Sequence, residues 1–154
     1  MVAGSHHGSE RQSFSHPRWL LDLLHYIYGI RPQCDVNSLK IKFSKTGMPR
    51  YVLLNGERLF TIKPNDFSIT LSKKGALFLD KCLPKPYARV WVEEEFGKTV
   101  FAKHVIDADP NIRRGVDVLI YKDRLIAFGK AVMSGEEMLN LNFGEAVRVR
   151  GKVE

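Results

Sequence analysis

Cysteines and long apolar runs are scarce in this 154-residue sequence. Its two cysteines, Cys34 and Cys82, form no CxxC pair, which argues against a zinc site built on both. A disulfide between them is disfavoured in a reducing cytosol, and Cys82 is expected to be a small core residue. No apolar run reaches the roughly 18 residues of a membrane-spanning helix, and no signal-peptide pattern is seen. These absences predict a soluble, cytoplasmic protein.

Catalytic signatures are also missing. The sequence has no nucleophile–base pairing, no phosphate-binding loop and no metal-ligand spacing. His104, Asp107 and Asp109 could be read as a metal or acid–base cluster, but turn chemistry explains residues 107–110. The sequence therefore predicts no catalytic residue, no metal and no cofactor. The first residues, 1–14, are small and polar, which predicts a disordered tail or a cloning remnant.

Negative charge is short in one half of the chain. The net charge is +7. Residues 1–87 contain 13 Lys and Arg against 6 Asp and Glu, whereas residues 88–154 contain 11 of each. A one-sided excess of cations indicates a polyanionic partner. The alternative is charge that serves solubility without a partner.

The first half has the pattern of a small α/β module, predicted at residues 15–83. Apolar residues at helical spacing indicate a first helix from Ser15 to Tyr28, ended by Gly29. Alternating runs joined by the Asn55-Gly56 turn predict an antiparallel meander with one apolar face. Its strands are expected at residues 39–45, 50–54 and 58–63, with a candidate fourth at 67–72 and a helix at 73–83.

The other face of the meander collects cations. Lys40 and Lys42 alternate with the inward-facing residues, and Lys45, Arg50 and Lys63 lie near the strand ends. One interpretation is a solvated sheet face, on which lysine is common. The other is a patch that follows the phosphates of a nucleic acid.

The second half is predicted to be a separate domain at residues 87–154. Two prolines in residues 84–86 mark the boundary. Ser134 and Glu137 have capping-box spacing and open a short helix, whereas residues 98–105 fit either a helix or a strand. Short strands with glycine turns indicate a small barrel, which makes the whole chain α+β. These strands are expected at residues 88–92, 116–121, 124–133 and 146–150.

An ordered series of short motifs runs through the second half. It consists of Gly97, the Val100–Lys103 run, Asp109, Ile112–Gly115, Val116–Val118, Ala127-x-Gly129-x-Ala131, Ser134-x-Glu136-Glu137-Met138 and Gly144-x-Ala146-Val147-x-Val149-Arg150. This series resembles the PUA domain, a pseudobarrel that binds structured RNA. Residues 16–82, notably Lys45–Val52 and Asn55–Glu57, are similar to the αβ module that precedes the PUA domain in archaeal tRNA-guanine transglycosylase, the archaeosine enzyme.

The resemblance covers roughly residues 16–154 and only the tail of that family's enzyme. The chain is too short to contain the family's catalytic barrel. The resemblance implies that the PUA domain holds the acceptor-stem end of tRNA and that the preceding module helps to grip the tRNA body. The implied RNA contacts are Gly97, Lys98, Phe101, Lys103 and His104, with Arg113, Arg114, Arg148 and Arg150 nearby and Lys40, Lys42, Lys45, Arg50 and Lys63 on the preceding sheet.

The residue types fit this role. Glycine allows close approach of a phosphate to the backbone, and lysine and arginine neutralise phosphates. The ring of Phe101 can stack on an unpaired base or fill the core, and the sequence leaves both open. The first functional prediction is an RNA-binding module for tRNA, alone or with a catalytic subunit of a split modification enzyme. The alternatives are a small enzyme acting on RNA or nucleotides and a protein-binding adaptor.

Overall fold

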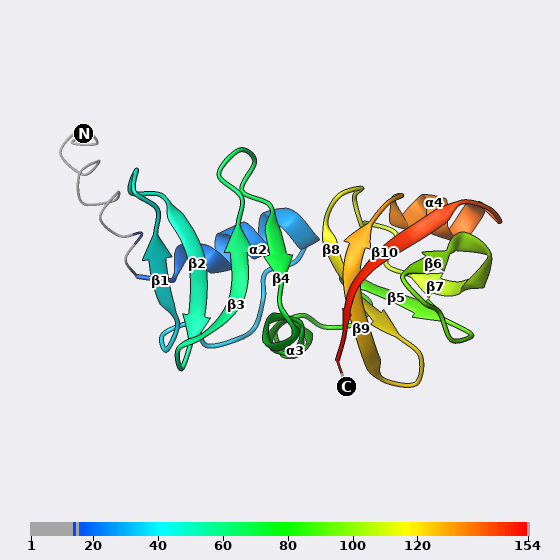
Figure 1. Cartoon of the computed structure of the whole chain (residues 1–154), viewed down its shortest axis with the longest axis horizontal. Coiled ribbons are helices and arrows are strands. Elements are labelled where there is room, and N and C mark those ends of the chain that lie inside the picture. The colour runs from blue at the N-terminus through cyan, green and yellow to red at the C-terminus, as the bar shows by residue number, and fades with distance from the viewer. Residues whose placement is uncertain (1–13, 15, 154) are drawn as a thin grey trace.

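The computed structural model describes Phe14 and residues 16–153, and two sheets follow one another along this part of the chain (Figure 1). The first has strand order β1-β2-β3-β4 and the second β6-β10-β9-β8-β5-β7. The elements are α2 (Trp19–Tyr28), β1 (Lys40–Phe43), β2 (Pro49–Leu54), β3 (Glu57–Ile62), β4 (Ile69–Leu71), α3 (Lys73–Cys82), β5 (Arg89–Val92), β6 (Thr99–Phe101), the 3-10 helix η2 (Ala102–His104), β7 (Val105–Ala108), β8 (Asp117–Tyr121), β9 (Leu125–Ala131), α4 (Gly135–Asn140) and β10 (Glu145–Lys152).

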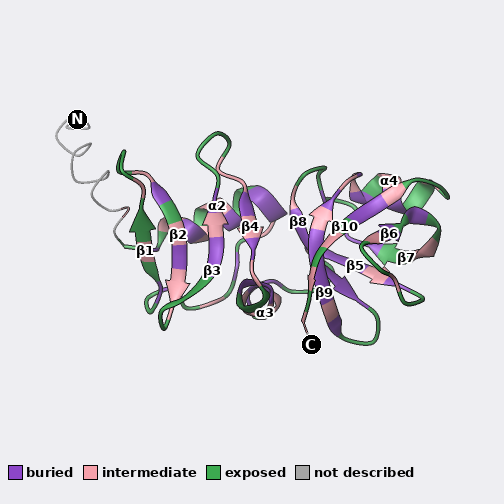
Figure 2. Ribbon diagram, viewed as in Figure 1, coloured by how far each residue is buried: buried purple, intermediate pink, exposed green. Residues whose placement is uncertain are grey.

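The first sheet is an antiparallel meander whose inner face packs on two helices. Its buried residues Val52, Phe60 and Ile62 share one core with Leu20 and Leu24 of α2. Figure 2 shows the resulting change along β2 and β3 between buried and accessible residues. The Asn55-Gly56 hairpin turn has positive φ at both residues, as predicted. The expected N-cap of the first helix, Ser15, and the tail before Phe14 lie outside the described residues.

The second sheet curls around its own core and is mostly antiparallel, with β5 and β8 paired in parallel (Figure 1). Gly129 permits the tight crossing of β9 and β10, because an added Cβ would lie 2.3 Å from the Arg148 carbonyl oxygen. The capping box is confirmed, with Ser134 Oγ accepting from the Glu137 N–H and Glu137 Oε1 accepting from the Ser134 N–H. The α+β class with a barrel-like second half is confirmed.

Buried polar contacts join the two halves. The Asp117 side chain is 1% exposed and accepts the Leu71 N–H at 2.8 Å and Arg150 Nε at 3.1 Å. Tyr28 Oη donates to the Asp117 carbonyl oxygen at 2.6 Å. Burial raises the pKa of the Asp117 carboxyl, and the Leu71 N–H and the charge of Arg150 oppose that rise. The two sheets therefore meet at a specific, polar joint.

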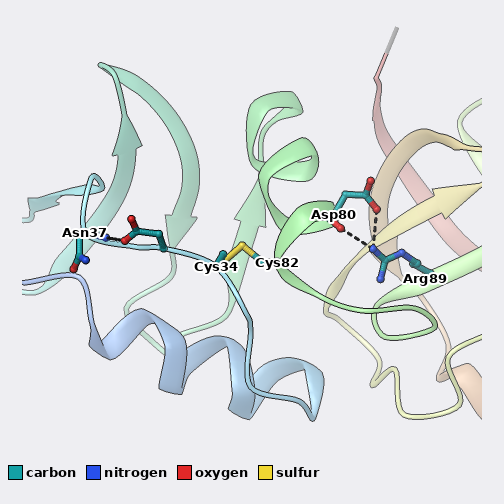
Figure 3. Close-up of a disulfide and its surroundings, with 6 residues drawn as sticks. Cys34, Asn37, Asp80, Cys82 and Arg89 are labelled. Atoms are coloured by element: carbon teal, nitrogen blue, oxygen red, sulfur yellow. Dashed lines mark hydrogen bonds and ion pairs between the residues drawn. A yellow bond between two sulfur atoms is a disulfide. The ribbon is translucent and has the colours of Figure 1, made fainter.

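A second joint links α3 to β5. Arg89, 2% exposed, places Nη2 2.8 Å from Asp80 Oδ1 and also donates to the Asp80 carbonyl oxygen (Figure 3). The Tyr121 hydroxyl donates to the same carboxylate. This arrangement satisfies a charge that would otherwise be costly to bury.

The expectation that the cysteines stay unpaired is wrong. Cys34 and Cys82 form a disulfide, with their Cα atoms 4.9 Å apart and a sequence separation of 48 (Figure 3). The Gln33 N–H donates to the Cys82 carbonyl oxygen, so the segment after α2 runs against the end of α3. This proximity is tertiary and leaves no sequence signal. Cys82 is buried, as predicted.

None of the helices in the described part of the chain has the length and apolar character needed to cross a membrane.

Candidate nucleic-acid interface

The face of the first sheet that points away from the core carries a group of polar and cationic side chains. Strand pairing aligns Lys42 with Tyr51, Tyr51 with Thr61, and Thr61 with Thr70 across all four strands. Lys40 lies two residues before Lys42 and therefore on the same face. The outer sheet face consists of these residues together with Arg50 and Arg58.

Two arginines converge on one aromatic ring in this face. The Cζ atoms of Arg50 and Arg58 lie 5.4 and 5.2 Å from the centroid of the Tyr51 ring. Both distances are within the range of cation–π attraction. Sequence reasoning included Arg50 but missed Tyr51 and Arg58. Only their positions in the strands could have indicated this face, since Tyr51 directly precedes the inward-facing Val52 and Arg58 follows the hairpin turn.

The positive charge of this face is uncompensated within the described residues. No carboxylate there forms an ion pair with Lys40, Lys42, Arg50 or Arg58, and Lys45 is likewise exposed without one. Lys63 differs in that it has an acidic neighbour. The pKa of Asp66 is lowered mainly by hydrogen bonds from Ser68, and the positive charge of Lys63 lowers it further. The outer sheet face thus has the electrostatics of an anion-binding surface.

A second candidate surface lies in the curled sheet. A hollow of about 200 Å³ is lined by residues that include Phe96, Gly97 and Phe101. Phe101 is 44% exposed, which settles the choice between core and surface in favour of the surface. Lys103, on η2, is also exposed.

Acidic residues border this hollow. His104 Nδ1 lies 3.2 Å from Glu94 Oε1 and 3.8 Å from Glu93 Oε1, although neither contact has hydrogen-bond geometry. One side-chain nitrogen or carboxylate oxygen from each of these three residues lies within 4.8 Å of those of the other two. His104 is therefore drawn toward Glu93 and Glu94 and not toward Asp109, which is buried and accepts the Ala88 N–H.

Comparison with known proteins divides the chain at the same place as its sheets. Residues 19–86 match the patch-forming domain C2 of tRNA-guanine transglycosylase, and residues 91–153 match the PUA domain. The chain is thus similar to a C2 domain followed by a PUA domain, and its two halves are called the C2 domain and the PUA domain accordingly.

Curated relatives of the chain include archaeal enzymes. The chain is 42% identical over 141 residues to tRNA-guanine(15) transglycosylase of Pyrococcus abyssi, covering 86% of this chain and 24% of that protein. It is 43% identical over 141 residues to the Methanocaldococcus jannaschii enzyme, covering 84% and 22%. The chain thus spans about a quarter of these relatives and corresponds to their C-terminal region, not to their catalytic domain.

Solved structures support the fold. A protein of unknown function, AF0587, superposes with a TM-score of 0.66 at 28% identity, over 90% of this chain and 47% of that one. A conserved PUA domain protein from Thermoplasma acidophilum superposes with a TM-score of 0.59 over 92% and 89% of the two chains. Its 18% identity makes it evidence for the fold alone.

Several arginines expected at the PUA surface already have partners in the protein. Arg113 donates to the Tyr26 carbonyl oxygen at 2.9 Å, and its Cζ atom lies 5.0 Å from the centroid of the Tyr26 ring. Arg114 binds both carboxylate oxygens of Glu137, and Arg150 binds the buried Asp117. Arg148, with Glu145 3.4 Å away, is the more exposed of the two β10 arginines. The PUA domain therefore offers fewer free cations than its sequence suggests.

Proposed function

We propose that this chain binds tRNA, as the RNA-binding C-terminal region of a tRNA-guanine transglycosylase. The C2 domain grips the body of the tRNA through the outer sheet face, and the PUA domain receives the single-stranded acceptor end at Gly97 and Phe101. Base exchange then depends on a catalytic domain in the same enzyme or on a separate catalytic subunit. The uncompensated charge of the outer sheet face is the observation that carries this proposal.

The placement of the two surfaces agrees with a large ligand. β1 and β6 lie toward opposite ends of the molecule in Figure 1. A ligand that touches both must be extended and must be anionic at the C2 end. A folded RNA with a single-stranded terminus has both properties. The charge pattern also weighs against a protein-binding adaptor, because no acidic neighbour among the described residues pairs with Lys40 or Lys42.

Salt-dependent tRNA binding tests the proposal. Gel-shift titrations should show micromolar or tighter binding to a tRNA transcript, with clear preference over duplex DNA of equal length at moderate salt. If the four cations of the outer sheet face each neutralise one phosphate, they contribute about −3 to the slope of log K against log salt.

Paired variants assign that slope to the C2 domain. Lys40→Ala with Lys42→Ala should weaken tRNA binding and reduce the slope by about 2, because two phosphate contacts are lost. The matched control is Lys73→Ala with Lys81→Ala, which removes two exposed charges from α3. Equal affinity for tRNA and duplex DNA, or equal effects of the two pairs, would overturn the proposal.

A further inference from the structure

The arginine–tyrosine cluster of the outer sheet face exists because of two β-bulges. Between β2 and β3, Val52 pairs with Phe60 but Leu53 pairs with Arg58, so Leu59 is the extra residue. Strict alternation would turn Arg58 inward, since Phe60 faces the core. The bulge lets Leu59 and Phe60 both point inward, at 2% and 0% exposure, and turns Arg58 outward.

The second bulge acts in the same way on Arg50. Between β1 and β2, Lys42 pairs with Tyr51 but Phe43 pairs with Pro49, so Arg50 is the extra residue of β2. Pro49 is buried and Arg50 is exposed beside the Tyr51 ring. Bulges re-aim side chains, and here two of them aim guanidinium groups at one aromatic ring.

Stability alone is a weak account of this cluster. An exposed cation–π contact contributes little, and each bulge interrupts a strand ladder. Two cations around one ring also repel each other, and no carboxylate among the described residues pairs with either. Planar guanidinium and phenol groups can stack on the face of a nucleotide base, and the guanidinium groups can also bind its phosphate.

We propose that Tyr51 and its two arginines form a stacking platform for unpaired bases of RNA, with Lys42 and Lys40 binding the adjoining phosphates. Lys42 is directly across from Tyr51, and Lys40 lies about 7 Å farther along the strand. A base within a duplex has both faces covered by its neighbours and cannot use the platform. The platform therefore selects single-stranded segments, whereas the lysines hold any phosphate backbone. This inference rests on the proposed RNA-binding function and adds which RNA structure the C2 domain reads.

Two short probes separate stacking from charge. One is an unstructured RNA 12-mer and the other is an RNA hairpin of similar length and charge, each titrated by fluorescence anisotropy at constant salt. Tyr51→Ala should weaken binding of the 12-mer about 5- to 100-fold, as loss of one stacking contact does, and change hairpin binding less than about 2-fold. Tyr51→Phe keeps the ring and should bind the 12-mer as the wild type does.

Variants at the cations complete the test. Arg58→Lys keeps the charge but loses the planar group, so it should weaken the 12-mer and spare the hairpin. Lys42→Ala should weaken both probes alike. Because Arg58→Lys leaves the ring and the charge in place, it remains informative even if Tyr51→Ala unfolds, which thermal melts will reveal.

The outcomes distinguish the platform from RNA binding in general. If the wild type binds tRNA but Tyr51→Ala and Arg58→Lys affect both probes equally or neither, the platform is wrong and the proposed function stands. If the wild type binds none of the RNAs, both proposals fail.

Discussion

At the scale of single residues, the partners of a side chain decide its role. Arg58, which is not among the RNA contacts expected from the sequence, has no carboxylate partner among the described residues and lies on the outer sheet face, whereas Arg150 binds the buried Asp117. Both are arginines in strands with alternating patterns, and nothing local distinguishes them. A bulge determines the first and a contact between the halves of the chain determines the second.

Phe101 provides the residue-scale test of the PUA surface. Its exposed ring beside Gly97 is expected to stack on a base of the tRNA acceptor end, so Phe101→Ala should weaken binding about 5- to 100-fold. Trimming the single-stranded 3′ end of the tRNA should cost the wild type a similar factor and the variant much less. Gel-shift affinities for intact and trimmed tRNA measure this coupling.

The control for Phe101 is Phe143→Ala, since Phe143 is 69% exposed and lies outside the hollow. It should respond to trimming as the wild type does. Independent, additive losses from Phe101→Ala and from trimming would show that the ring and the acceptor end do not meet.

At the scale of elements, both the local sequence pattern and tertiary contacts decide whether a segment becomes a helix or a strand. The helix α4 begins where its capping box predicts. Residues 98–105, by contrast, fitted a helix or a strand, and the structure contains β6, then η2, then β7. Pairing of β6 with β10 and of β7 with β5 supplies the hydrogen bonds that favour strand at both ends.

The charged Glu137 in the cap of α4 should make the unfolding free energy depend on pH. The hydrogen bond from Arg114 and that from the Ser134 N–H lower the pKa of Glu137 from 4.5 to about 2. Because the folded-state pKa is depressed, this stabilisation is present above the unfolded-state value and disappears as pH falls toward 2. Glu137→Gln should therefore be destabilised relative to the wild type at pH 7 and equal to it near pH 2.

Urea denaturation across that pH range measures the difference in unfolding free energy. Glu136→Gln is the control, because Glu136 is an exposed carboxylate in the same helical turn. It should show little change at any pH. A difference between Glu137→Gln and the wild type that stays constant from pH 7 to pH 2 would contradict the role assigned to the charged cap.

At the scale of the whole molecule, one disulfide and two polar joints hold the chain together. The disulfide closes a 48-residue separation within the C2 domain, between the segment after α2 and the end of α3. Asp80 on α3 then contacts Arg89 on β5 in the PUA domain. The disulfide and the contact with Arg89 therefore both lie at the C-terminal end of α3 (Figure 3).

Reduction should lower global stability without altering the RNA surfaces. For a loop of this length the chain-entropy account gives at most about 4 kcal/mol of unfolding free energy. Guanidinium titrations of oxidised and reduced protein should differ in midpoint, and Cys34→Ser should match the reduced protein under both conditions. An unchanged midpoint on reduction would show that the bond contributes nothing to folding, and tRNA affinity of the folded protein serves as the control.

Features that depend on a few neighbouring residues were largely predictable from the sequence. The Asn55-Gly56 turn, Gly29 at the helix end and the capping box at Ser134 each act over a few residues, and each is where the pattern indicated. Alternation predicted the apolar and cationic faces of the meander, because side chains on a strand point to opposite faces in turn. The ordered motifs of the second half were enough to indicate the PUA fold.

The sequence by itself thus determined most of the elements and their order, the fold class and the cationic first half, but not the strands at residues 99–108. Only the tertiary structure decided which charges are free, which cysteines pair and which arginines meet Tyr51. The physical reason is the sequence distance over which each interaction acts, since turns, caps and periodicity depend on neighbours in the chain. Ion pairs such as Arg150–Asp117, the Cys34–Cys82 bond and the bulges beside Tyr51 depend on segments that meet only after folding.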